Sequence, residues 1–456
     1  MCLIGEVDMM GKLTRILGLI ICIAMMGTQV FAISNESNTR DVKSDLEKDY
    51  GISIILPEES DCGDFSECLT TLEKCIKRFP AGMIKEITDF YLQKGIAVNV
   101  IFDKTEIIRD LFSQSPEDEN SVNIYIKTLE SSLYSGPCYA SEQAVMHVLS
   151  QFVCNYILDN HDSSKLRGEF NRLNAGYEYG SWDDDYEKVY INKHSATNFQ
   201  EEIADLIWYA EVNPSFVRSL DKDTGAAIHE KIKLLAKEFD VIFDSITENT
   251  KLWLDAIPQA PQAWARDIIA QMKANLLIPD EFDGLYEAYI KREGFYELIL
   301  NMIGKYYDLG ACEEYVALDP LKGEIYVSDG ITYTNYYDYL TKSSDTLYQA
   351  MQIGILNTDS INESQDYMTR LEIAKTLVYI GNELGMDISD YKILAYDDIV
   401  DVSENDKPYI YIAASKGLLK GDGRNFKPYD YCTYQEAYVI LYRLYKSLYH
   451  YIYGNR

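Results

Sequence analysis

The feature that most constrains the fold is a layout that occurs three times in the second half of the chain. Each copy has a helical pattern, a Gly or Asn before an apolar pair, an acidic or glycine-rich loop, and a second helical pattern. The steps from Asn275 to Arg292, Gly354 to Arg370 and Gly417 to Tyr434 are 17, 16 and 17 positions. Such self-similarity is typical of stacked supersecondary units. We therefore expect all-α helical hairpins at 257–312, 328–386 and 394–450.

The first half has a different pattern, in which short β-branched runs alternate with amphipathic stretches. Strands are expected at 50–56, 96–102 and 122–126, and helices at 65–79, 82–93, 141–160, 199–212 and 231–246. This pattern predicts an α+β domain over residues 48–256. A chain of 456 residues is too long for one core, and two prolines within 257–261 place the domain boundary there.

The N-terminus has the order of a secretory signal. Lys12 and Arg15 precede an apolar run at 16–26, and small residues precede a cleavage point after Ala32. We expect a signal peptide at 1–32, a flexible polar lead at 33–47 and a secreted mature protein without a transmembrane anchor. An uncleaved anchor is the alternative.

Charge narrows the range of partners. The formal net charge is −31, and a nucleic-acid partner would require clustered Lys and Arg. We therefore expect no nucleic-acid ligand.

One polar pair lies on the predicted helix at 141–160. His147 and Gln151 are four residues apart and share a helix face, as do the histidines of the zinc-binding motif H-E-x-x-H. A single histidine on a helix is more often a structural residue than a ligand, so the pair needs support from its context.

That context lies downstream, in residues 197–205 (TNFQEEIAD) and the His194 before them. The order of these segments resembles the zinc peptidase domain of the anthrax lethal factor family. The resemblance implies a zincin-like fold for the first half. It also puts Glu201 at a zinc-ligand position, Asp205 at the position of a carboxylate that lies just outside the zinc ligands, and His194 at the position of a tyrosine that assists the transition state.

The chain departs from that family at the two positions that matter most. Val148 stands at the general base, and valine cannot take a proton from water. Gln151 stands at the second histidine, and an amide is a poor zinc ligand. We therefore expect a vestigial metal set of His147, Gln151 and Glu201, no catalysis and no cofactor. The alternative is an active secreted peptidase with zinc at an atypical site.

The repeats carry a second resemblance. Residues 421–428 (GDGRNFKP), 368–372 (MTRLE), 290–294 (IKREG) and 264–265 (WA) resemble motifs of S-layer homology modules. The resemblance implies a three-module prism that binds cell-wall polysaccharide. The binding residues it implies are Arg292, Arg370, Trp264 and Arg424. Alternatively, Arg292 and Arg370 cap or bridge helices.

Together these features predict a secreted protein of the bacterial cell surface or cell wall. Its N-terminal domain would act in binding, with a protein or peptide as a possible ligand. A purely structural surface protein is a further alternative.

Overall fold

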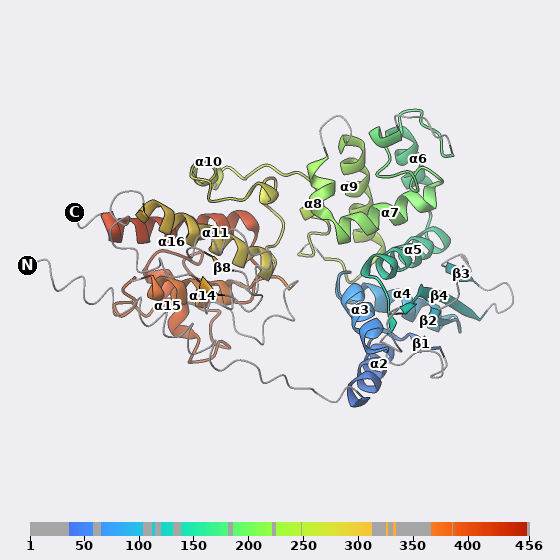
Figure 1. The fold of residues 1–456 in the computed structure, drawn as a ribbon, viewed down its shortest axis with the longest axis horizontal. Coiled ribbons are helices and arrows are strands. Elements are labelled where there is room, and N and C mark those ends of the chain that lie inside the picture. Colours follow the sequence, from blue (N-terminus) through green and yellow to red (C-terminus); the bar gives the residue numbers. More distant parts are fainter. Residues whose placement is uncertain are drawn as a thin grey trace, which may run out of the picture. The chain divides into compact units, whose positions relative to one another are not determined.

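The computed structural model divides into two compact units, which meet in sequence at Pro258 and Gln259 and are described separately (Figure 1). The structure describes residues 36–57, 65–103, 112–114, 120–130, 138–180, 186–220, 225–247, 249–311, 325–326, 332–333, 366–384 and 386–453. The predicted signal peptide lies outside these residues, as does the first helix expected in the second repeat.

The N-terminal unit is a mixture of helices and short strands, as its sequence pattern predicts. Its elements in chain order are α2 Glu36–Tyr50, β1 Ser53–Ile55, α3 Ser66–Ile76, α4 Met83–Gln93, β2 Ala97–Asp103, β3 Phe112–Gln114, β4 Ser121–Lys127, β5 Leu129–Glu130, β6 Cys138–Tyr139, α5 Glu142–Asn160, α6 Ser164–Leu173, η1 Tyr186–Lys188, α7 Phe199–Val212, α8 Pro214–Ser219, α9 Gly225–Ile242 and η2 Leu254–Ala256. The helix predictions at 141–160 and 199–212 are confirmed within one residue.

The expectation of a flexible lead is wrong from Glu36 onward, because residues 36–47 lie in α2. Leu46 is buried in the main core, and Val42 packs against it. Val42, Leu46 and Tyr50 recur every four residues and so share one face of this charged helix, which packs on the core. The surrounding charges hid this short apolar stripe.

The main sheet has the strand order β1-β2-β4-β3. β1, β2 and β4 are parallel, with Ser53 opposite Asn99 and Asn99 opposite Asn123. β3 adds an antiparallel edge against β4. The strands expected at 50–56, 96–102 and 122–126 are therefore confirmed as β1, β2 and β4.

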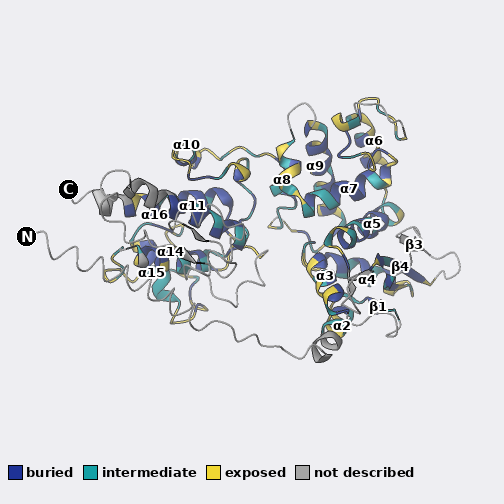
Figure 2. Cartoon of the chain, viewed as in Figure 1, coloured by how far each residue is buried: buried dark blue, intermediate teal, exposed yellow. Residues whose placement is uncertain are grey.

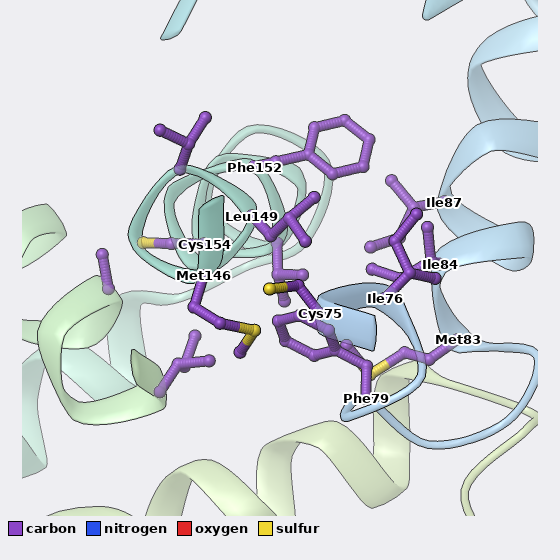
Figure 3. Packing of buried hydrophobic residues seen from close by; sticks show 14 of the residues in the cluster. Cys75, Ile76, Phe79, Met83, Ile84, Ile87, Met146, Leu149, Phe152 and Cys154 are labelled. Carbon is purple, nitrogen blue, oxygen red and sulfur yellow. The ribbon is translucent and has the colours of Figure 1, made fainter. Parts of the chain in front are cut away.

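Helix α5 runs through the core of this unit (Figure 2). Its buried side chains Leu149 and Phe152 point toward Ile84 and Ile87 of α4, while Cys154 lies on another side of the helix (Figure 3). Helix α7 packs against α5 as well. A helix covered on several sides can hold polar residues only where they find partners.

The C-terminal unit is mostly helical. Its elements are α10 Arg266–Ala274, η3 Asp280–Phe282, α11 Arg292–Ala311, β7 Ile325–Tyr326, β8 Thr332–Tyr333, α14 Arg370–Glu383, α15 Lys407–Ser415 and α16 Tyr434–Tyr453. The expectation of an all-α second half is wrong in one respect, since β7 and β8 form a short antiparallel pair.

Helices α11, α14 and α16 each follow an extended stretch, at 288–292, 366–370 and 430–434. We call these stretches the axial segments, because they join in a closed ring. Their backbone hydrogen bonds are Ile290 N to Cys432 O (2.8 Å), Cys432 N to Met368 O (3.0 Å) and Met368 N to Ile290 O (3.0 Å). Ile290, Met368 and Cys432 are fully buried at 0% exposure. The central residue of each segment therefore donates a backbone hydrogen bond to one neighbouring segment and accepts one from the other, as in a three-fold arrangement.

Candidate functional site

The polar residues predicted for the N-terminal unit lie together between α5 and α7. Ser141 caps α5 by accepting from Ala144 N at 3.1 Å, and Asn198 caps α7 by accepting from Glu201 N at 2.9 Å. These caps set where each helix begins. His147 and Gln151 then share one face of α5, and Glu201 and Asp205 share one face of α7.

Asp205 is the centre of this group. Its Oδ2 lies 3.0 Å from Nδ1 of His194, and its Oδ1 lies 3.6 Å from Nδ1 of His147. The two imidazole rings are 5.4 Å apart between centroids. His147, His194 and Asp205 each offer a ligand atom within 4.8 Å of the others, so these three could hold a metal ion. The cluster shares only His147 with the expected vestigial set, and His194 and Asp205 stand in it in place of Gln151 and Glu201.

Asp205 also orients the His194 ring. A carboxylate accepts hydrogen bonds, so the 3.0 Å contact favours the His194 tautomer with hydrogen on Nδ1, whereas the 3.6 Å contact to His147 is too long for a hydrogen bond. Nε2 of His194 then keeps a lone pair and lies 3.6 Å from Glu201 Oε2. Holding a ligand imidazole by its other nitrogen is how outer carboxylates orient metal sites.

Burial shifts the charge state of the cluster. It lowers the pKa of His147, although the Asp205 carboxylate opposes that shift. It also raises the pKa of Asp205, against a hydrogen bond from His194. A lowered pKa keeps the His147 imidazole neutral near pH 7, the form that can bind a metal.

The two departures from the peptidase pattern have clear structural places. Gln151 Nε2 donates to Glu201 Oε2 at 3.2 Å, while its Oε1 is buried without a partner among the described residues. Val148 is 1% exposed and belongs to the apolar core. The described part of α5 therefore carries no carboxylate at the position of the general base.

A buried ion pair next to this cluster was not predicted from the sequence. Lys231 of α9 and Glu202 of α7 pair at 0% and 1% exposure, and Tyr179 donates to the same carboxylate. Lys231 also donates to the carbonyl of Val189 at 2.6 Å. The pair joins α7 to α9 and so helps to hold Glu201 and Asp205 in place. A lysine within the apolar pattern of α9 is the one sequence signal that could have revealed it.

The predicted wall-binding arginines are engaged inside the C-terminal unit. Arg292 is 7% exposed and donates to Glu372 at 2.8 Å. Arg370 donates to the carbonyls of Phe426 and Lys420, both at 2.9 Å. These contacts agree with the alternative interpretation of the sequence, in which Arg292 and Arg370 bridge structural elements and do not bind a ligand.

The other two predicted residues are more accessible. Trp264 is 53% exposed, and its indole nitrogen donates to Gln262 at 2.8 Å. Arg424 extends from the 421–428 loop and donates to Asp397 at 2.7 Å. The loop itself is ordered by Asp422, whose carboxylate accepts from the backbone nitrogens of Arg424 and Asn425.

The first residue of each of helices α11, α14 and α16 meets the third residue of another of these helices, and we call these three contacts the junctions of the ring. The three junctions differ from one another. Arg292 faces Glu372, and Arg370 lies 3.9 Å from Glu436. At the third junction Tyr434 replaces arginine, and a Cβ added to Gly294 would lie 2.7 Å from its hydroxyl oxygen. An Arg–Glu pair at two junctions is thus replaced by a Tyr–Gly contact at the third.

Comparison with known families supports one part of this picture. Residues 395–437 match the S-layer homology domain, a stretch that includes α15, the 421–428 loop and the start of α16. No curated protein and no solved structure matches the chain. The S-layer homology domain indicates association with the cell surface or cell wall. Among the described residues, no helix is long and apolar enough to cross a bilayer.

Proposed function

We propose that this is a wall-anchored binding protein. The C-terminal unit would bind cell-wall polysaccharide, and the N-terminal unit would be a zincin-like domain that no longer cleaves peptides. The observation that carries the anchoring role is the S-layer homology match at 395–437. The axial ring supports two further modules, because 288–292 and 366–370 have the same backbone contacts as 430–434.

Two features support the loss of peptidase activity. Val148, in the core, occupies the general-base position, and Gln151, whose amide is hydrogen-bonded to Glu201, occupies the second zinc-ligand position. Hydrolysis by a zinc peptidase needs a base to activate the metal-bound water. Without it, the fold can still bind a peptide or protein in an extended site, and we propose that role for the domain.

The proposal is tested with the full mature chain in two assays. Sedimentation with purified cell walls should remove the protein from solution in a saturable way, and a peptide library should remain uncut. Failure to sediment would refute the anchoring role. Cleavage that a chelator stops would refute the loss of activity.

One observation favours a second function, that of an active metallopeptidase with an atypical site. His147, His194 and Asp205 are a donor set that fits a divalent transition metal, and Glu201 lies beside them. Zinc bound there would polarise a carbonyl and lower the pKa of a bound water. Elemental analysis of the purified chain distinguishes this function from the first, since only an active site requires stoichiometric metal.

A further inference from the structure

Three tyrosines occupy equivalent places in the axial segments. Tyr289, Tyr367 and Tyr431 each stand one residue before the buried ring residue. Their ring centroids are 5.5, 5.5 and 5.4 Å apart in the three pairs. The residues that follow them differ between the copies, as Ile290, Met368 and Cys432. The aromatic position is therefore the same in all three segments while its neighbour varies.

This cluster, the tyrosine triad, is partly open to solvent. Tyr431 is 47% exposed and Tyr367 is 37% exposed, although the ring residues beneath them are at 0%. Aromatic rings whose centroids lie about 5 Å apart are in direct contact. The rings are inclined to one another by 57°, 65° and 59°, so the triad is a closed cluster with no room between its rings for a cation as in an aromatic cage, and a ligand would stack on an outward ring face.

The charged residues beside the tyrosine triad decide which class of ligand it suits. Asp366 and Asp430 immediately precede Tyr367 and Tyr431, and both are exposed. Carboxylates accept hydrogen bonds from hydroxyl and amide groups and repel anions. The combination suits a ring that has an apolar face and hydroxyl donors at its rim.

We propose that the tyrosine triad is a stacking site for an uncharged or amine-bearing sugar of the wall polysaccharide. The proposal rests on the proposed anchoring function and adds the place and class of sugar. The proposed sugar contact lies on an exposed surface at the ring axis and not at Arg292 and Arg370, whose side chains form hydrogen bonds within the C-terminal unit. Binding there would depend on apolar contact more than on charge, and it should persist at high salt.

The test uses the full chain and measures its affinity for purified wall polysaccharide at low and high salt. Tyr431→Ala should weaken binding about tenfold, the scale of one well-formed aromatic contact. Tyr431→Phe keeps the ring and should bind within about twofold of the parent. Tyr367→Ala should also weaken binding about tenfold. Tyr391→Ala is its matched control and should leave binding unchanged, since both side chains are 37% exposed and Tyr391 lies outside the triad.

A second measurement uses the unchanged protein, so that it does not depend on a variant's folding. Nitration of exposed tyrosines, mapped by mass spectrometry, should slow at Tyr367 and Tyr431 when polysaccharide is bound and stay unchanged at Tyr391. Equal nitration with and without polysaccharide, or full affinity in Tyr431→Ala, would overturn the stacking site and leave the anchoring function standing. Failure of the unchanged chain to bind walls would overturn both.

Discussion

At the α5–α7 site each functional position occurs once, whereas in the axial ring each position occurs three times. The difference shows in how each tolerates substitution. In the function proposed above, one valine and one glutamine would be enough to remove the base and a ligand from the first site. The ring accommodates Ile, Met and Cys at its buried positions, because backbone hydrogen bonds hold it closed. Chemistry carried by single side chains is thus more easily lost than a scaffold built from repeated backbone contacts.

The largest effect is expected at the ion pair that supports the first site. Lys231→Met leaves the Glu202 carboxylate buried at 1% exposure without its cation. Breaking one half of a buried pair costs about 3–5 kcal/mol, so the free energy of unfolding should fall by that amount. Denaturant titration of the full chain measures it. Lys231→Met combined with Glu202→Gln should recover most of the loss, and an additive double variant would show that the two residues are not coupled.

An intermediate effect is expected at the third junction of the ring. A Cβ at Gly294 would lie 2.7 Å from the Tyr434 hydroxyl oxygen, so Gly294→Ala introduces a clash. Overpacking of this kind costs about 1–3 kcal/mol, against a gain of about 1 kcal/mol for alanine over glycine in a helix. With Tyr434→Phe as the background, the clash disappears and Gly294→Ala should stabilise the chain. A double-mutant cycle from thermal melts measures the coupling, and a coupling near zero would mean that Tyr434 does not fill this junction.

A further effect concerns the pH dependence of stability in the C-terminal unit. Burial and the neighbouring Glu281 raise the pKa of Glu297 to about 8. A carboxyl group whose pKa is raised on folding contributes stability below its unfolded pKa, and that contribution is lost as pH rises toward 8. Stability should therefore fall as pH rises from 5 to 8, by less than the whole pKa difference would give, because Glu297 is only partly buried and water screens its charge. Glu297→Gln should flatten this part of the profile, and an unchanged slope would place the titration elsewhere.

The sequence was a good guide where the periodic pattern was long. Helix α7 spans the expected 199–212, and β2 and β4 follow their β-branched runs. Helix α2 was missed because the apolar side chains by which it contacts the core, Val42, Leu46 and Tyr50, stand among many charged residues.

The sequence analysis named His147, His194 and Asp205, but it put only His147 in the expected metal set. Spacing groups His147 with Gln151 on α5 and Glu201 with Asp205 on α7, but it cannot show that one carboxylate would contact both imidazoles. The tyrosine triad was hidden in the same way, since its members lie 64 or more positions apart among 38 tyrosines. Such groups form only when the fold closes, through contacts that no local pattern encodes.

The central claim for the N-terminal unit is that single side chains, and not geometry, separate the α5–α7 site from a working zinc site. Calorimetric titration of zinc into the full chain and into its Gln151→His variant tests this most directly. The new imidazole replaces an amide beside Glu201, so zinc affinity should rise at least about tenfold. Gln151→Asn, which adds no good ligand, is the control and should leave affinity unchanged. Equal zinc affinity in Gln151→His and the parent would contradict the claim and show that these residues do not converge on a metal.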